Sequence, residues 1–204
     1  MNRDEMIAKG RKVIEMERYE LGRLMDSLDD SFVRGVELIT DCRGKIILTG
    51  TGKSGLIGRK IAATLCCTGK PAFFLSAYNC ENGDIGAIQP DDLIIVISNS
   101  GETEILKNLV IPSAKTIGAK AICLTGNTES TLAKQCDVAI YIGVEKEACP
   151  TGVNATTSTT NTLAMGDALA MVSEEIRGVT REQVLFYHQG GAWGEKLKDE
   201  FGDR

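Results

Sequence analysis

The order of apolar and polar positions divides the chain into helices and short strands. Between residues 4 and 28, apolar side chains recur at near 3.5-residue spacing with charges between them, which predicts a long amphipathic helix; they are Met6, Ile7, Val13, Ile14, Leu21, Leu24, Met25 and Leu28. A second helix is expected after "LDDS", with Phe32, Val33, Val36 and Ile39 on one face behind a capping residue. An arm of this length ahead of the first strand usually packs on something, often a second subunit, so we expect an oligomer.

Five short apolar runs follow, and helical patterns separate them. The runs at 45–50, 71–76, 91–100, 119–126 and 138–143 predict strands, and the stretches 54–68, 102–117, 129–135 and 156–176 predict helices. Residues 144–156 are expected to form a loop, and a short helix is expected after Thr180. This alternation predicts an α/β fold, a three-layer αβα sandwich around an open, mostly parallel five-stranded sheet. We expect one domain over 1–204, with helices in 1–42 and the core and C-terminal helices in 43–204.

Small and hydroxylated residues stand where the predicted strands end. Gly50-Thr51-Gly52, Ser98-Asn99-Ser100-Gly101 and Thr125-Gly126 each follow an apolar run, and a further loop follows Gly143. In open sheets of this kind the ligand binds beyond the carboxyl ends of the strands. These ends therefore predict a site for a compact polar anion.

Composition narrows the class of protein. The net charge of −5 gives no basic footprint for nucleic acid, and no apolar run reaches the roughly 18 to 20 residues of a membrane span. The N-terminal segment is too charged for a secretory signal. Seven cysteines without a CxxC pair favour reduced thiols in the cytoplasm over a disulfide framework or a zinc ribbon. With a single histidine there is no His-rich ligand set, so we expect neither a metal nor a cofactor.

The stretch "ILTGTGKSGLIGRK" (46–59) resembles a phosphate cradle, and two nucleotide interpretations of it are weak. A triphosphate loop needs a glycine five residues before Gly52, where Ile47 stands. The residues 50–55 fit the dinucleotide fingerprint G-x-G-x-x-G literally, but the second strand ends in Phe74-Leu75-Ser76 without the expected acid. The interpretation that remains for this stretch is a site for a smaller phosphate compound.

A second polar loop, "SNSGET" (98–103), favours one phosphate monoester. It lies between an apolar strand and a helix, so that the helix N-terminus supplies free N–H groups and the positive end of a dipole. Ser98, Ser100 and Thr103 offer hydroxyls, and Asn99 offers an amide. An ordinary helix cap would explain this loop alone, but not its pairing with the glycine turn on a neighbouring strand.

These residues resemble a known family. "SNSGET" is similar to the phosphate loop of sugar isomerase (SIS) domains, which have a flavodoxin/Rossmann-like fold. From residue 40 onward, "GTGKSGLIGRKIAATL", "NGDIGAI", "KEACPTG", "TSTTNTLAMGDALA" and "HQGGAWGEKL" resemble, in order, motifs of bacterial D-arabinose-5-phosphate isomerases. The resemblance implies interconversion of D-ribulose 5-phosphate and D-arabinose 5-phosphate, feeding synthesis of the eight-carbon acid sugar Kdo. It also implies a homodimer or homotetramer with shared active sites.

Isomerisation between an aldose and a ketose needs a phosphate anchor, a base and a group that manages hydroxyl protons. Glu147 is the first candidate base, and we expect partial burial to raise its pKa. By resemblance, His188 opens the ring or relays a proton, delivered from the neighbouring subunit. Lys53 stands at a helix start, where a cation is disfavoured unless a ligand compensates, and Glu104 is the weakest candidate. The expected substrate-binding residues are Gly52, Ser54, Asn82, Ser98, Asn99, Ser100, Thr103, Thr157 and Ser158.

Two departures from the family pattern leave alternatives open. The family's "H-G-D-L-G" reads Asn82-Gly83-Asp84-Ile85-Gly86, and asparagine cannot shuttle a proton near neutral pH as histidine can. The chain could therefore isomerise another ketose phosphate, such as a hexulose 6-phosphate, or bind a sugar phosphate or a Kdo-type product without turnover. Many members carry a paired CBS module after the isomerase domain; the sequence ends at Arg204, and we expect a stand-alone SIS domain.

Overall fold

The computed structural model describes residues 1–188, 190, 191, 194–196 and 199. Two helices come first, and five strands then alternate with helical segments along the chain. In order they are α1 (Arg3–Asp26), α2 (Asp30–Asp41), β1 (Ile46–Gly50), α3 (Gly52–Cys67), β2 (Ala72–Phe74), η1 (Ala77–Asn82), η2 (Asp84–Ala87), β3 (Leu93–Ile97), η3 (Leu106–Val110), α4 (Ile111–Ile117), β4 (Lys120–Thr125), α5 (Thr131–Gln135), β5 (Val138–Tyr141), α6 (Thr157–Ile176) and α7 (Arg181–Phe186).

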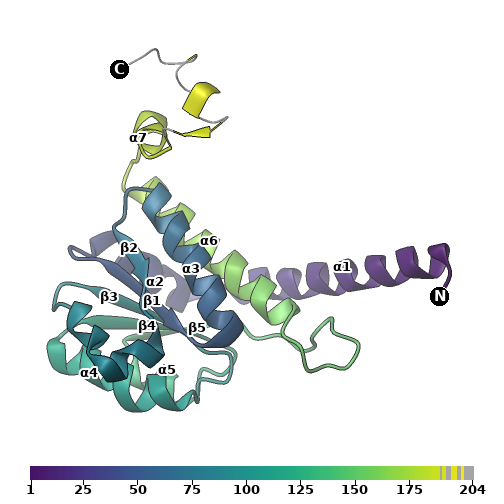
Figure 1. Ribbon diagram of the computed structural model, residues 1–204, viewed down its shortest axis with the longest axis horizontal. Coiled ribbons are helices and arrows are strands. Elements are labelled where there is room, and N and C mark those ends of the chain that lie inside the picture. The colour runs from purple at the N-terminus through teal and green to yellow at the C-terminus, as the bar shows by residue number, and fades with distance from the viewer. Residues whose placement is uncertain (189, 192–193, 197–198, 200–204) are drawn as a thin grey trace.

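The five strands form one parallel sheet in the order β2-β1-β3-β4-β5 (Figure 1). β3 lies at its centre and is buried along its whole length, as the continuous apolar run "LIIVI" requires. The chain first moves from β1 to one edge and then crosses to β3 on the other side of β1. Ligands in such sheets bind at this switch point, beyond the carboxyl ends of the two strands. The predicted three-layer fold with a parallel five-stranded sheet is confirmed.

Helices cover both faces of the sheet. α2, α3 and α6 pack on one face and bury alternate strand residues such as Ile46 and Leu48. η3, α4 and α5 cover the other face, where Ile47 and Ile94 point. α6 and α3 pack side by side and run in the same direction (Figure 1). Both faces of the sheet are therefore dry, and only its edges and the strand ends reach solvent.

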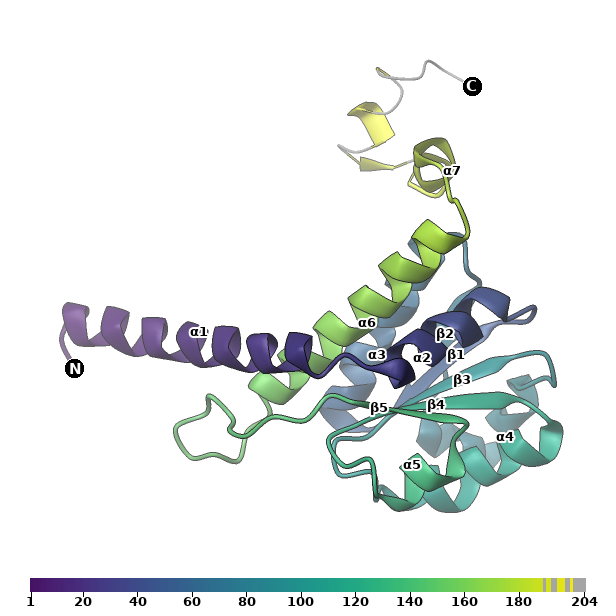
Figure 2. The same cartoon turned by 180° about the vertical axis from the view of Figure 1, so that it is seen from behind.

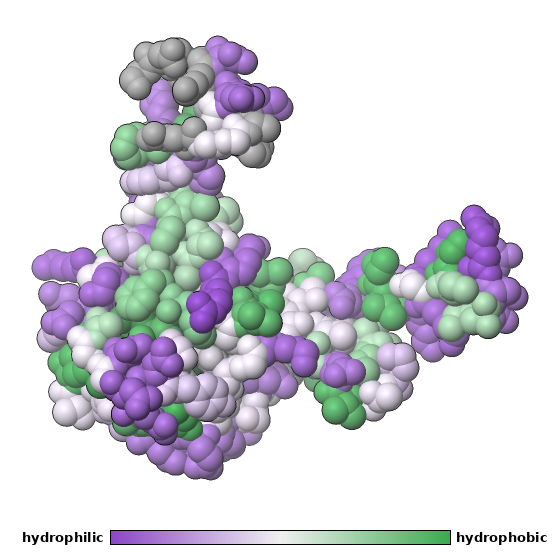
Figure 3. Space-filling view, viewed as in Figure 1, coloured by the Kyte–Doolittle hydropathy of each residue, from purple (hydrophilic) through white to green (hydrophobic). Residues whose placement is uncertain are grey.

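The N-terminal helix α1 leaves the body of the protein as an arm (Figure 2). Its last turns pack on α6, where Leu24 is buried, but residues 1–15 are all exposed. The apolar stripe predicted for this helix is therefore largely open to solvent, and Ile14 is 70% exposed. Figure 3 shows apolar surface on this arm and along the face formed by α3 and α6. No helix in the described part of the chain is long and apolar enough to cross a membrane.

Two local features differ from the predicted elements. The segment between β2 and β3 forms the two 3₁₀ helices η1 and η2, for which the apolar pattern gave no prediction. The helix expected from Glu102 begins at Glu104, and its first part, η3, is a π-helix that continues into α4. Wider π turns inside helices are often found at functional sites.

Candidate active site

The N-termini of α3 and α6 meet at the carboxyl edge of the sheet. An ion pair joins Lys60 Nζ on α3 to Asp167 Oδ1 on α6 at 2.5 Å, and Gly166 packs against Ile61. The two helices run in the same direction and begin a comparable distance before this contact, at Gly52 and Thr157. Their positive dipole ends therefore both face this edge, which favours negative charge there.

The glycine turn after β1 provides the first part of this edge. Gly52 has φ +55°, a conformation that side chains other than glycine rarely adopt, and it opens α3 without a side-chain cap. Lys53 is exposed in the first helical turn, and Ser54 is half-buried. A cation at a helix N-terminus is unfavourable on its own and gains from an anion bound beside it.

The loop 98–103 provides the second part. Ser98 is buried, and its hydroxyl lies 2.9 Å from that of Thr103 and accepts the Gly101 N–H at 3.1 Å. Ser100 and Asn99 are exposed, and the Ser100 hydroxyl accepts the Glu102 N–H at 3.2 Å. The loop is thus a preformed turn that directs two exposed polar side chains outward at the end of the central strand.

Gly101 allows this turn to fit against β4 and α5. Its φ is +68°, and a Cβ there would overlap the Ser130 side chain and come within 3.1 Å of Thr125 Oγ1. Ser130 is itself buried and caps α5 by accepting the Ala133 N–H. The close approach and the left-handed backbone both require glycine.

Gly101→Ala is therefore expected to lower the free energy of unfolding by about 2–4 kcal/mol through strain and overpacking. Urea unfolding followed by circular dichroism measures this. Gly10→Ala is the matched control, because nothing lies within 4 Å of a Cβ at this exposed helical position. It should keep or raise stability by up to about 1 kcal/mol. Equal midpoints for both variants would contradict the packing described here.

Glu147 lies in the loop after β5 and caps α6. Its Oε2 accepts the Thr156 N–H at 2.7 Å and the Ser158 N–H at 3.3 Å, and it also accepts the Thr156 and Thr157 hydroxyls. Thr157 and Ser158 are buried in the first turn of α6, and their role in substrate binding stays a prediction. Glu147 therefore lies at the same edge of the sheet as the α3 turn.

The expected rise in the pKa of Glu147 is wrong. Partial burial alone would raise its pKa, but hydrogen bonds from Ser158 and Thr156 to the carboxylate outweigh burial, and the net shift is downward. Glu147 is thus a carboxylate held ionised by a helix N-terminus. It can accept a proton only if a ligand displaces some of these donors or excludes water from it.

His188 lies far from these groups within its own chain. Its Nδ1 is 2.6 Å from the Val184 carbonyl oxygen, and its Nε2 is 3.1 Å from Cys67 Sγ at the C-terminal end of α3. Cys67 follows Lys53 by fourteen residues of helix, about 21 Å at 1.5 Å per residue. A single chain therefore does not bring His188 to the glycine turn that carries Lys53. Gln189, Ala192, Trp193 and Leu197 of its motif lie outside the described residues.

Glu104 and Asn82 occupy the margin of the site. Glu104 Oε1 is 2.8 Å from Lys107 Nζ and its Oε2 accepts from Asn108, contacts that lower the pKa of Glu104. Its side chain is 76% exposed, and its catalytic role stays a prediction. Asn82 ends η1, is exposed, and precedes Gly83 at φ +110°. Because η1 packs against η3, Asn82 lies on the same face of the sheet as the helical segment that follows the loop 98–103.

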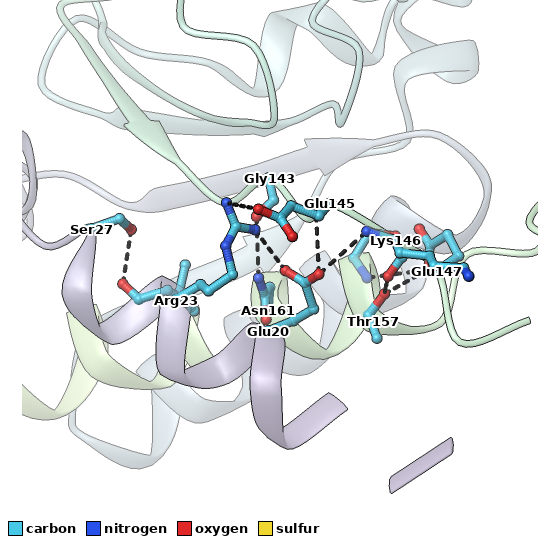
Figure 4. Close-up of polar contacts among 11 residues, drawn as sticks. Glu20, Arg23, Ser27, Gly143, Glu145, Lys146, Glu147, Thr157 and Asn161 are labelled. Atoms are coloured by element: carbon cyan, nitrogen blue, oxygen red, sulfur yellow. Dashed lines mark hydrogen bonds and ion pairs between the residues drawn. The ribbon is translucent and has the colours of Figure 1, made fainter. Parts of the chain in front are cut away.

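The sequence reasoning missed two residues that shape the loop after β5. Thr156 donates to Glu147 from both its backbone and its hydroxyl. Glu20 of α1 is 1% exposed and accepts two backbone N–H groups from this loop (Figure 4). In the described part of the chain, no group of three or more His, Cys, Asp or Glu side chains is placed to hold a metal ion.

The chain is similar to known proteins over most of its length. Two curated relatives carry the name arabinose 5-phosphate isomerase KdsD: one from Yersinia pestis is 46% identical, and one from Escherichia coli K12 is 44% identical, each over 92% of this chain. The chain spans 57% of the length of these relatives. The solved structure of Escherichia coli CFT073 c3406 in complex with arabinose 5-phosphate is 36% identical, with a TM-score of 0.88, covering 92% of this chain and 100% of that one.

The family itself follows from the part of the chain that builds the site. The family model described as SIS domain matches residues 38–172. This span includes the whole sheet, the glycine turn, the loop 98–103 and the start of α6. The chain therefore belongs to the SIS domain family.

Proposed function

We propose that this protein is an aldose–ketose isomerase that interconverts D-ribulose 5-phosphate and D-arabinose 5-phosphate. The observation that carries the proposal is the preformed hydroxyl turn at 98–103, at the same sheet edge as the N-termini of α3 and α6. One phosphate monoester matches the donors of such an edge. The names of the curated relatives and the arabinose 5-phosphate in the similar solved structure support a five-carbon sugar phosphate as the substrate.

The reaction moves one proton between neighbouring carbons and one between neighbouring oxygens. In the forward direction, Glu147 removes a proton from C1 of the ketose and returns it to C2, while the O1 proton passes to O2. Lys53 stabilises the negative charge that develops on oxygen in the enediolate between these steps. His188 handles the hydroxyl protons and opens the ring of the cyclic aldose. Ser98, Asn99, Ser100 and Thr103 hold the phosphate with Gly52 and Ser54.

The site is completed by a second copy of the chain. His188 is remote from Glu147 and Lys53 within one chain, which supports its delivery from a neighbour in a homodimer or homotetramer. The exposed apolar stripe of α1 and the apolar face of α3 and α6 supply surfaces for such an assembly (Figure 3). All seven cysteines are free thiols, which supports a reducing cytoplasmic setting.

Incubation of the purified chain with D-ribulose 5-phosphate tests the activity directly. Appearance of D-arabinose 5-phosphate by ¹³C NMR is the expected result, with slower turnover of hexulose 6-phosphates. Stabilisation of the fold by D-arabinose 5-phosphate without any turnover would instead favour a sugar-phosphate sensor. Asn82 is the residue that supports this second function, because it replaces a histidine of the family pattern and cannot relay a proton.

Ser100→Ala is expected to raise KM for the sugar phosphate by about 10- to 100-fold, because a hydrogen bond to a charged group contributes about 1.5–3 kcal/mol. The Ser100 side chain is exposed, and among the described residues its hydroxyl accepts only the Glu102 N–H. Thr116→Ala is the matched control, since this exposed hydroxyl bonds the Pro112 carbonyl at the opposite end of the same helical segment. The same KM in both variants would rule out Ser100 as a phosphate ligand.

The arm predicts association in solution. Ile14→Lys places a charge in the exposed stripe of α1 without touching the monomer core, because this side chain is already 70% exposed. Sedimentation velocity should show a dimer or tetramer for the unmodified protein. The variant should already dissociate at concentrations about 10-fold higher, or more, than those at which the unmodified protein dissociates. Arg11→Lys, which conserves charge at another exposed position of the arm, is the control. A monomeric unmodified protein would contradict the shared site.

A further inference from the structure

One carboxylate of the arm is buried where the helix pattern calls for an apolar side chain. Glu20 follows Met6 and Val13 at spacings of seven on the α1 stripe, and its side chain is 1% exposed. A buried charge is costly unless it is paired and its remaining lone pairs accept hydrogen bonds. Its contacts show what compensates this cost.

Glu20 binds the loop that carries Glu147 (Figure 4). Its Oε1 accepts the backbone N–H of Glu145 at 3.1 Å and that of Lys146 at 3.3 Å. Its Oε2 is 2.9 Å from Arg23 Nη1, and Arg23 Nη2 is 3.3 Å from Glu145 Oε1. One carboxylate on α1 thus fixes two consecutive amides directly before Glu147.

The other side of this short segment is fixed by α6. Thr157 donates its hydroxyl to the Lys146 carbonyl at 2.6 Å, and the Glu147 carboxylate caps the first turn of the same helix. Residues 145–147 are therefore held between two helices, while residues 150–154 of the same loop are exposed. Without Glu20, the amides of Glu145 and Lys146 would lose their acceptor, and the α6 contacts and the pair of Arg23 with the Glu145 side chain would remain.

We infer that Glu20 is a positioning residue for Glu147: it sets the backbone of 145–146 and thereby the place of the carboxylate over the substrate. The inference rests on the proposed function in treating Glu147 as the base. Catalytic groups depend steeply on position, and a misplacement of about 1 Å can cost about 10²-fold in rate. Because α1 is also the arm that presents the exposed stripe, the same helix links assembly to the geometry of the site.

The test compares Glu20→Ala with Glu15→Ala, which removes a similar Glu–Arg pair on an exposed part of the same helix. Amide hydrogen exchange at Glu145 and Lys146 should accelerate at least about 10-fold in Glu20→Ala and stay unchanged in the control. In the isomerase assay, kcat should fall about 10- to 100-fold with KM within about 3-fold, because the phosphate loop is untouched. In a Glu147→Gln background, Glu20→Ala should lower kcat no further.

Each outcome decides a separate point. Unchanged exchange at the two amides overturns the inference. A double variant Glu20→Ala/Glu147→Gln whose kcat falls by the product of the two single losses overturns it as well. Accelerated exchange in a protein whose unmodified form shows no turnover overturns the proposed function and leaves the hold of Glu20 on the loop standing. If Glu20→Ala does not fold, Glu20→Gln provides the same comparison. Its amide oxygen still accepts an N–H, so protection and kcat should lie between those of the unmodified protein and a variant with no acceptor.

Discussion

Glu147→Gln is expected to lower kcat for isomerisation by about 10²–10⁴-fold, the range that a general base contributes. Glutamine keeps the length of the side chain and an oxygen that can still accept the Thr156 and Ser158 N–H groups. The start of α6 should therefore remain capped, and KM should change little. Steady-state kinetics with D-ribulose 5-phosphate, together with a thermal unfolding curve, separates lost chemistry from lost structure.

The pH dependence of the unmodified protein follows from the direction of the pKa shift at Glu147. Donors from Thr156 and Ser158 hold the pKa of this carboxyl below the ordinary value of a glutamate. The apparent pKa of the acid limb of the kcat/KM profile, which reports the free enzyme, should therefore lie below the ordinary pKa of a glutamate. The same shift makes the carboxylate stabilising above its unfolded pKa, and this contribution disappears as the pH falls through the folded pKa. Glu147→Gln should thus be less stable near neutral pH and equally stable in strong acid.

Glu37→Gln is the control for both measurements. It removes an exposed carboxylate that pairs with Arg34 on α2, away from the carboxyl edge of the sheet, and should change neither kcat nor the acid limb. An unaltered kcat in Glu147→Gln would exclude Glu147 as the base. An acid limb above the ordinary glutamate range would show that another group controls the rate.

The fold could be predicted because each local pattern agreed with the final structure. Continuous apolar runs such as 93–97 occur when both faces of a strand are covered, and glycine or hydroxyl residues at their ends gave the strand limits within a few residues. The segment 77–87 shows neither the apolar period of a helix nor that of a strand, because its short 3₁₀ turns bury only Ala77 and Cys80. Its structure depends on packing against η3, which a local pattern does not contain.

The site could be predicted only where the groups follow directly from strand ends. The turns at 52–54 and 98–103 lie where the sheet places them, but the hold of Glu20 on residues 145 and 146 joins positions 125 and 126 residues apart. A signal for it did exist, because Glu20 continues the seven-residue spacing of Met6 and Val13 with a charged side chain. The direction of the pKa shift at Glu147 could not be predicted from the sequence for a similar reason. It depends on which donors surround the carboxylate, and burial alone suggested a rise where the net shift is downward.

Mixing two inactive variants is expected to restore activity if the sites are shared. His188→Ala should lose most of kcat, because it removes the group that handles hydroxyl protons. In an assembly of His188→Ala with Glu147→Gln chains, some sites combine an intact Glu147 from one chain with an intact His188 from its neighbour. With random pairing of equal amounts, about one site in four is intact, so about a quarter of the unmodified activity should return. Sites built within one chain would return none.

The distance within one chain makes this experiment decisive. His188 contacts Cys67 at the end of α3 opposite to Lys53, and an α-helix is too rigid to bring its two ends together. A site that uses both residues must therefore take them from different chains, or α7 must leave its place. Recovery upon mixing would favour two chains. Activity that stays near zero upon mixing, with each variant still associating in sedimentation, would instead require that α7 swing within its own chain. A His188→Ala variant that is active by itself would show that His188 takes no part in the reaction.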